Sequence, residues 1–406
     1  MPSVLESAGY RRLLYSSSFV IFGVMGQAVG RGWLAKDLTG SNAGLGGVML
    51  AFGFSMLLAT PWGGVAADRF PKRTVLLVAV LMLVASSLLV GLAVVTDSIE
   101  YWMLLLASAG QAAAFALYLP ARIAFIVEVV EPDEIGEAVT LSQTAQEAMR
   151  VIAPALAGVL IGVSWFGVGG VFLLAAGTSV LSALVLLGMP PGDPRAASTR
   201  SPIAEMVDAF RYVRSRQSLG LVALTTIGVV VIAFPYLTFM PTLADERYDV
   251  GAGGYGLMAG VAGLGAVAAG LVVPRVRWSV QRPWRTIALS GAALGVALVA
   301  LALAAWFWTA LLALVAIGAS GLVFQTTTQS QMLALSDVDY HGRMQSMVVL
   351  GFSGFGLAAL PLGLLADALT LEVTLALMGV AVLIVSGAFT LKRAQHRRRF
   401  VGVEFG

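Results

Sequence analysis

Twelve apolar segments, each close to the length that crosses a lipid bilayer, constrain this chain more than any other feature of its sequence. An α-helix needs roughly 20 mostly apolar residues to span the hydrocarbon core. The predicted spans are residues 12–36, 43–67, 74–96, 99–127, 136–163, 165–189, 218–243, 253–274, 284–304, 306–335, 342–366 and 371–392. Because lipid cannot satisfy exposed backbone polar groups, this pattern predicts an all-α integral membrane protein with twelve transmembrane helices.

The composition excludes several classes of site. Hydrophobic residues make up 58% of the 406 residues and charged residues only 12%, whereas soluble proteins carry about 25% charged residues. The absence of cysteine and the presence of only two histidines exclude a disulfide framework, a thiolate metal site and Cys-His catalysis. We therefore expect no metal and no cofactor. A polytopic membrane enzyme is the least favoured alternative, since no paired carboxylates lie near the middle of a span.

The single long polar stretch, residues 190–217, divides the chain. It predicts an N-terminal six-helix bundle at 1–189, a linker with a short amphipathic helix at 190–217, and a C-terminal six-helix bundle with a basic tail at 218–406. A weak internal repeat supports two pseudo-symmetric halves. Spans five and eleven both begin with Gly and carry Pro and then Gly near the far end, namely Pro154 and Gly158, and Pro361 and Gly363. Repeated halves are typical of secondary transporters.

The basic residues predict the orientation in the membrane. Of the 25 Lys and Arg residues, all except Arg31, Lys36, Arg150 and Arg247 fall on one side of the predicted spans. The positive-inside rule places that side, with both termini, in the cytoplasm. We expect a multi-pass protein of the inner or plasma membrane, whose basic runs contact anionic lipids rather than nucleic acid.

Several segments carry a family resemblance. The loop GGVAADRFPKR at 63–73 resembles the signature loop of the major facilitator superfamily. The segments WLAKDLTGS, LPARIAFIVEVVEPDEIGEAVTL, AFRYVR and HGRMQSM resemble the drug-efflux branch that contains macrolide-efflux and enterobactin-export proteins. The resemblance covers essentially the whole chain and implies the major facilitator fold, alternating-access transport of a small molecule, and a monomer.

The resemblance also implies a conformational latch, in which Asp68 faces the start of span eleven. The residues expected to form it are Gly64, Asp68, Arg69, Lys72, Arg73, Arg122, Gly342 and Arg343. A carboxylate is stabilised there by the partial positive charge of a helix start. The basic members are also explained by topology alone.

Three departures from the family bear on proton coupling. Val24 follows Gly23, where many relatives have an acidic residue, and the segment ASAGQAAAFA lacks the Arg common in drug-proton antiporters. The antiporter motif of span five is present only as APALAG, which retains Pro154 and Gly158.

Span five holds the main candidates for proton coupling, Glu147 and Arg150. Glu147 lies about 15 Å beyond Glu137 along a helix, near the middle of the bilayer, and Arg150 shares its face. Charges at that depth usually face a cavity and a partner. Three roles are open: proton exchange at Glu147 controlled by Arg150, binding of an anionic or zwitterionic head group, or a structural ion pair.

Other polar and aromatic residues on spans expected to line a cavity are candidates for substrate contact. They are Gln27, Arg31, Gln111, Phe115, Tyr118, Gln143, Tyr236, Phe239, Met240, Gln325 and Gln329. For Arg31 the favoured interpretation is that it snorkels to the far interface. An apolar, aromatic and amide lining favours a large amphipathic ligand.

The sequence therefore predicts an exporter of amphipathic compounds (drug-like molecules, siderophores or metabolites) with protons as the coupling ion. The alternatives within the same fold are a lysolipid flippase or an uptake carrier that uses Arg150 and Arg31 for an anionic group.

Overall fold

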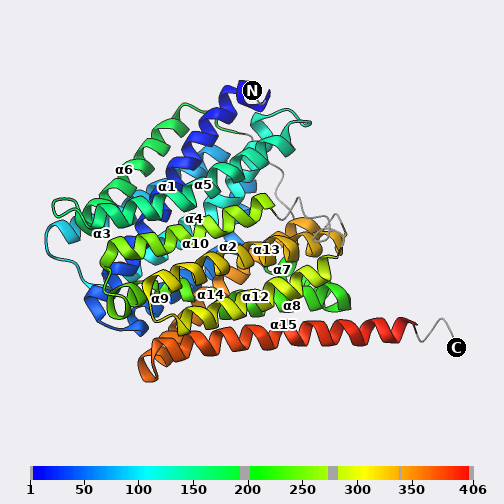
Figure 1. Cartoon of the computed structure of the whole chain (residues 1–406). Helices are drawn as coiled ribbons and strands as arrows, with labels where there is room; N and C mark the ends of the chain where they lie inside the picture. Colours follow the sequence, from blue (N-terminus) through cyan, green and yellow to red (C-terminus); the bar gives the residue numbers. More distant parts are fainter. Residues whose placement is uncertain (1–2, 193–201, 273–281, 338–339, 402–406) are drawn as a thin grey trace. The chain divides into compact units, whose positions relative to one another are not determined.

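The computed structural model describes residues 3–192, 202–272, 282–337 and 340–401, and these residues are almost entirely helical (Figure 1). A short 3-10 helix, η1, covers Ser3–Glu6. The helices of the first part are α1 (Ala8–Thr39), α2 (Asn42–Arg69), α3 (Lys72–Val95), α4 (Tyr101–Val129), α5 (Ile135–Ile161) and α6 (Gly167–Leu187). They are followed by α7 (Pro202–Ser215), α8 (Gln217–Ala233), α9 (Tyr236–Thr242), the π-helical η2 (Leu243–Arg247), α10 (Gly251–Val272), α12 (Pro283–Leu303), α13 (Phe307–Ala334), α14 (His341–Ala368) and α15 (Leu371–Val401).

The predicted all-helical membrane fold is confirmed. Eleven helical segments of the described residues are long and apolar enough to cross a membrane, and Ser353–Ala368 of α14 is a shorter apolar segment. The seventh predicted span is a broken helix: α8 ends at Ala233, a turn contains Phe234 and Pro235, and α9 and η2 continue to Arg247. Pro235 explains the break, because proline removes a backbone donor and clashes with the preceding turn.

Local sequence explains where the first helices begin and end. Ser7 caps α1 by accepting a hydrogen bond from the backbone N–H of Tyr10, and Ser41 caps α2 in the same way from Gly44. Between them, Gly40 adopts φ 60° and donates its N–H to the carbonyl of Lys36. This left-handed position favours glycine and ends α1 before α2 starts.

The chain forms two compact units. Unit 1 comprises Met1–Glu205, Thr238–Gly260 and Ala359–Gly363, and unit 2 comprises Met206–Leu237, Val261–Ala358 and Leu364–Gly406. Unit 1 thus contains α1 to α6 together with α9 from Thr238 onward, η2, the first half of α10 and a short piece of α14. The division into bundles at residues 189 and 218 was drawn from the repeat and the linker, and it stays a prediction.

Glycine contacts bring the helices of unit 1 together. A Cβ on Gly63 of α2 would overlap the carbonyl oxygen of Ala116 on α4. A Cβ on Gly158 of α5 would lie 2.5 Å from the Cα of Gly256 on α10, and one on Gly46 would lie 2.5 Å from the carbonyl oxygen of Ala359. Small residues allow such close backbone approach in membrane helices.

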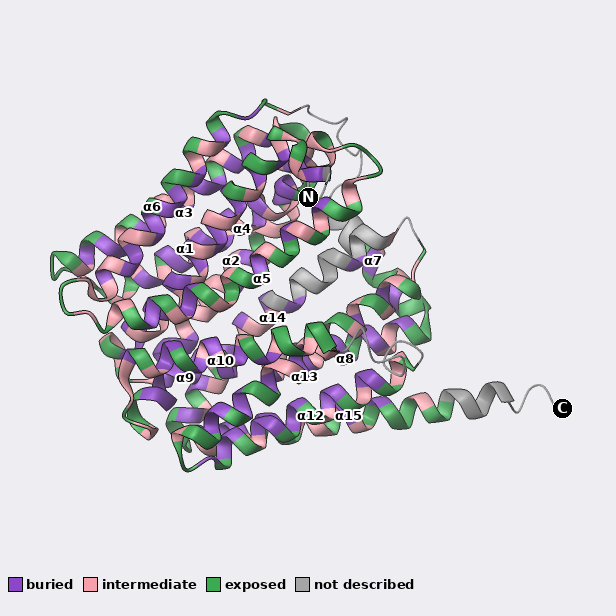
Figure 2. Cartoon of the chain, turned by 45° about the horizontal axis from the view of Figure 1, so that its top comes forward, coloured by how far each residue is buried: buried purple, intermediate pink, exposed green. Residues whose placement is uncertain are grey.

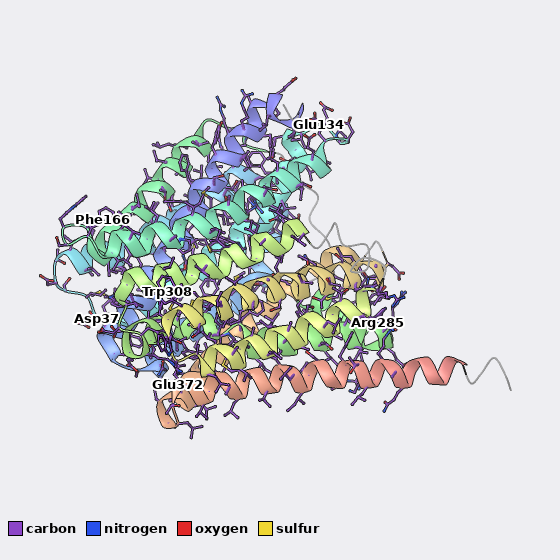
Figure 3. All side chains as sticks on the ribbon, viewed as in Figure 1. Asp37, Glu134, Phe166, Arg285, Trp308 and Glu372 are labelled. Carbon is purple, nitrogen blue, oxygen red and sulfur yellow. The ribbon has the colours of Figure 1, made fainter. Side chains whose placement is uncertain are left out.

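Unit 1 has two ends, which the labelled side chains of Figure 3 locate. Glu134, before α5, lies at one end with the start of α1, whereas Asp37 and Phe166 lie at the other. Each end holds one buried lysine, so we call them the Lys72 end and the Lys36 end.

Helices of unit 2 also approach one another closely at glycine residues. Gly295 of α12 meets Gly379 of α15, and Gly318 of α13 meets Ala262 of α10. The linker helix α7 packs within this unit: the Tyr212 ring stacks on Tyr340 at 3.7 Å, and the Tyr212 hydroxyl donates to Asp337 at 3.0 Å. Arg285 and Trp308 mark its opposite ends in Figure 3.

Candidate substrate pathway

A stripe of exposed polar residues runs along α5, from the Lys72 end toward the middle of the helix (Figure 2). The α5 polar stripe consists of Glu137, Thr140, Gln143, Thr144, Glu147 and Arg150. The opposite face, with Ala138, Ser142, Gln146 and Ala153, is buried. This spacing of three and four residues places the stripe on one side of the helix. The predicted candidate Gln143 lies within it.

Glu147 and Arg150 form an ion pair on this stripe. The Arg150 Nε lies 3.6 Å from the Glu147 Oε1, and the side chains of Arg150 and Glu147 are 52% and 50% exposed, respectively. A half-exposed ion pair about 15 Å into a membrane helix is costly against lipid. This face of α5 is therefore suited to an aqueous pathway rather than to hydrocarbon.

The face of α4 that sequence predicts as cavity lining is present, but most of it is buried within unit 1. Gln111 is 2% exposed, Tyr118 1% and Arg122 3%, while Phe115 is half-buried. Tyr118 belongs to the same core as Tyr10 and Leu13 of α1, and Ser17 lies close to its hydroxyl. In this conformation the face is covered by α1.

Hydrogen bonds near Arg122 join α1 to α5. The Tyr10 hydroxyl donates to the carbonyl of Ala138 at 2.7 Å and lies 3.0 Å from the Ser142 Oγ. The charged and titratable neighbours of Arg122 are Tyr118, Tyr10 and Arg150. Tyr10 was not among the candidates from sequence, because one tyrosine at the start of a membrane helix has no distinguishing pattern.

The two candidates on α1 are both buried. The Gln27 Oε1 accepts a hydrogen bond from Ser87 of α3 at 3.1 Å. Arg31 is only 4% exposed, so the interpretation that it snorkels outward is wrong for this structure. Tyr255 of α10 lies beside it, and Gly32 next along α1 approaches Tyr255 and Pro241. Residues from more than 200 positions away in the sequence cover Arg31.

Polar contacts join sequence-distant segments at the Lys36 end. Lys36 forms an ion pair with Glu246 of η2, and the Thr242 hydroxyl donates to the Asn42 Oδ1 at 2.8 Å. Pro154 and Gly158 are buried on α5. Gly158 of α5 also approaches Gly256 of α10 closely, so α5 and α10 contact each other near this end.

The basic residues at the start of α3 have structural partners. Lys72 is fully buried and lies 3.6 Å from the Glu128 carboxylate of α4. Arg73 donates through its side chain to the carbonyl of Met189 at 2.8 Å and through its backbone to Pro191. These contacts join the start of α3 to α4 and to the residues that follow α6.

The predicted latch is described only in part. Asp68 is half-buried, Arg69 and Gly64 are exposed, and neither Asp68 nor Arg69 forms an ion pair among the described residues. Gly342 lies in the first turn of α14, and the Arg343 side chain falls outside the described residues. Arg122 lies beside Tyr10 and Tyr118. The latch stays a prediction.

The remaining candidates come from the second half of the sequence. Tyr236, Phe239 and Met240 are buried, and Gln325 and Gln329 are half-buried. Within the described residues no group of His, Cys, Asp and Glu side chains has the arrangement of a metal site.

Comparisons with known proteins agree with this architecture. The profile of the family described as "Transmembrane secretion effector" matches residues 3–398. The chain is 24% identical over 392 residues to the staphyloferrin A transporter of Staphylococcus aureus (strain NCTC 8325 / PS 47), covering 93% of this chain and 95% of that protein. It is 28% identical over 226 residues to multidrug resistance protein MdtH of Yersinia pestis (strain Pestoides F), covering 54% of this chain and 51% of that protein.

Solved structures share the fold at low sequence identity. A POT family transporter in complex with 5-aminolevulinic acid superposes with a TM-score of 0.78 at 12% identity, covering 95% of this chain and 96% of that chain. A bacterial homologue of the human lysosomal transporter Spinster, in an inward-facing and unoccupied conformation, gives a TM-score of 0.72 at 16% identity, covering 96% of each chain.

Proposed function

Because this chain belongs to the transmembrane secretion effector family of major facilitator transporters, we propose that it exports amphipathic small molecules by alternating access, with protons as the coupling ion. It is a membrane transporter and not an enzyme. The names of its relatives support the substrate class, since one is a siderophore (staphyloferrin A) transporter and another a multidrug resistance protein.

The proposed orientation follows the distribution of basic residues. The Lys72 end, with Arg11, Arg12, Arg69 and Arg73, faces the cytoplasm, and the Lys36 end faces the opposite side. Both termini are then cytoplasmic, as expected for a protein of the inner membrane. In this orientation the α5 polar stripe leads from the cytoplasm to the middle of the bilayer.

The α5 polar stripe is the observation that carries the proposal. In it Glu147 is the only carboxylate far from a helix end, and Arg150 is its ion-pair partner. When the pair is formed, Arg150 stabilises the charged carboxylate; when a conformational change separates the two groups, desolvation favours the protonated form. Glu147 would then take up and release one proton in each cycle.

Proteoliposomes of known orientation test this mechanism. An imposed pH gradient should drive labelled amphiphiles toward the side of the Lys36 end, and Glu147→Gln should abolish the gradient dependence. Glu137→Gln is the matched control, because Glu137 lies on the same stripe but in the first turn of α5. If Glu147→Gln transports normally, or if flux ignores the gradient, proton coupling through Glu147 is wrong.

A lysolipid flippase is the second candidate. A shallow apolar groove lies between α1, α5 and α6, lined by residues that include Phe22, Gly26, Leu156, Leu160 and Leu174. A hydrocarbon chain contacts an apolar lining of this kind more favourably than a polar compound does. Gradient-independent movement of a labelled lysolipid in the same vesicles, with no movement of the other amphiphiles, would favour this function over export.

A further inference from the structure

Buried donors without an acceptor are concentrated on α4. In the described part of the chain, ten buried side-chain nitrogen and oxygen atoms lack a hydrogen-bond partner, and five of them lie on this helix. They are the Ser108 Oγ, the Gln111 Nε2, the Tyr118 hydroxyl and the Nε and Nη1 of Arg122. We call these four residues the α4 donor stripe. Their spacing of 3, 7 and 4 positions places them on one face of the helix.

All five atoms are able to donate a hydrogen bond, and those of Arg122 and Gln111 do nothing else. Buried polar groups in folded proteins are nearly always paired, so a row of unpaired donors needs an explanation. A bound acceptor-rich group would satisfy the donors of Tyr118 and Arg122, which lie about 6 Å apart along the helix. Ser108 lies about 21 Å from Arg122 along the helix and is out of reach of the same group. Water alone would satisfy single members, but it would leave the charge of Arg122 without a counter-ion.

The charges around Arg122 point to an anion. All four charged side chains that are buried among the described residues are basic: Arg31, Lys36, Lys72 and Arg122. The two lysines have carboxylate partners, whereas neither arginine forms an ion pair in the described part of the chain. Burying a charge without compensation is strongly unfavourable.

The groups facing Arg122 from neighbouring helices do not supply the missing negative charge. They are Tyr10 of α1, Tyr118 of α4 itself and Arg150 of α5, which is a second guanidinium. Arg150 is half-exposed on the α5 polar stripe, so Arg122 lies next to the proposed aqueous pathway. It is also only about 10 Å along the helix from the end of α4 at Val129.

We propose that Arg122 and Tyr118, at the Lys72 end of the α4 donor stripe, bind an oxyanion of the transported compound, a carboxylate or a phosphate. This inference rests on the proposed export function and gives its substrate class: amphiphiles with an anionic head. A guanidinium matches carboxylate and phosphate oxygens in charge and geometry. Phe115 and Tyr118, whose ring centroids are 6.4 Å apart, offer an aromatic surface to the apolar part.

A matched series of arylalkyl compounds tests the proposal in proteoliposomes containing the full-length protein. The series carries the same aromatic tail with a carboxylate, a phosphate monoester, a neutral amide or a trimethylammonium head. The quantity measured is the ratio of the initial export rate of each oxyanion to that of the amide. For the wild type we expect a ratio of about 10 or more, from the strength of charge-assisted hydrogen bonds. The faster oxyanion identifies the head group.

Three variants make the result specific. Arg122→Gln should lower the ratio to about 1, Arg122→Lys should keep an intermediate value, and Tyr118→Phe should lower the ratio by a few-fold while keeping the ring. Arg285→Gln is the control, because Arg285 is an exposed arginine at the start of α12 in unit 2, and it should leave the ratio unchanged. Size-exclusion profiles and melting temperatures show that each variant is folded.

The outcomes separate the two proposals. Equal export of the anionic, neutral and cationic compounds by the wild type, or a ratio that survives Arg122→Gln, would overturn the oxyanion site while export stands. A wild type that moves none of the four compounds would overturn the proposed function and the oxyanion site together.

Discussion

The contact between Gly158 and Gly256 gives the sharpest test of alternating access. A Cβ on Gly158 would lie 2.5 Å from the Gly256 Cα, and a Cβ on Gly256 would lie 2.6 Å from the Gly158 Cα. Because carbon atoms pack at about 3.5–4.0 Å, Gly158→Ala must move the two backbones apart by about 1 Å. Overpacking of this kind costs about 1–3 kcal/mol. If the Lys36 end opens during transport, that cost falls only on the closed state, and the open population should rise by about 5- to 150-fold.

Cysteine labelling measures this shift directly. The chain has no cysteine, so a single Ala244→Cys probe has no background. Ala244 is fully buried at the Lys36 end, and a membrane-impermeant maleimide should label the probe only when that end opens. The labelling rate should rise by the same factor in Gly158→Ala, up to the limit set by full opening.

Gly136→Ala is the matched control for this experiment, because Gly136 lies on the same helix with open space around it. It should leave the labelling rate unchanged. An unchanged rate in a folded Gly158→Ala protein would refute the reasoning, as would an equal rise in Gly136→Ala. Either result would mean that the glycine contact does not distinguish two states of the transporter.

Two further predictions concern the Lys72 end. Glu128→Gln leaves the fully buried Lys72 without its carboxylate, and should lower the free energy of unfolding by about 3–5 kcal/mol, seen as a lower melting temperature. Glu131→Gln, at an exposed loop position, is its control, and equal melting temperatures would contradict the role of the pair. Asp68→Asn should weaken the proposed latch by about 0.3–1 kcal/mol and favour the state open to the cytoplasm, which reduces labelling of Ala244→Cys by about 2- to 5-fold. Asp97→Asn in the loop after α3 is its control, and unchanged labelling in Asp68→Asn would remove the latch.

Sequence was sufficient for the features that depend on local chemistry. The membrane helices follow from apolar length, and the break in the seventh span follows from Pro235, which lacks a backbone donor. The α5 polar stripe and the face of α4 were also predictable, because both depend only on the period of a helix. The pairing of Glu147 with Arg150 was predictable for the same reason, because residues three positions apart lie on one face of a helix.

Features that depend on distant segments could not be predicted. Distance along α1 places Arg31 near the far interface, but it does not show that Tyr255 lies beside it. Counting charges explains Lys72 and Arg73 as topology signals, yet their partners are Glu128 and the carbonyl of Met189. In both cases the missing information is which helix packs where. Small residues such as Gly158 allow particular helices to pack closely, but the sequence does not show which helix each of them contacts.

The uneven distribution of charge between the units bears on how export would be driven. In unit 2, α8 and α13 carry no charged residue and α12 carries only Arg285 in its first turn, whereas unit 1 carries Arg31, Arg122, Glu147 and Arg150 in helix interiors. In the proposed cycle one proton enters through Glu147 while one oxyanion bound at Arg122 leaves. An inward proton and an outward anion both transfer positive charge to the inside of the cell. A membrane potential that is negative inside therefore drives both movements. At about 2.3 kcal/mol per charge per 100 mV, the potential would contribute about 4–5 kcal/mol per cycle before the pH gradient adds its share. A cation exported against one proton would gain nothing from the potential, since the two charges cancel. The arginine-rich interior of unit 1 therefore suits an anionic substrate, and the membrane potential supports the export of an anion better than that of a cation.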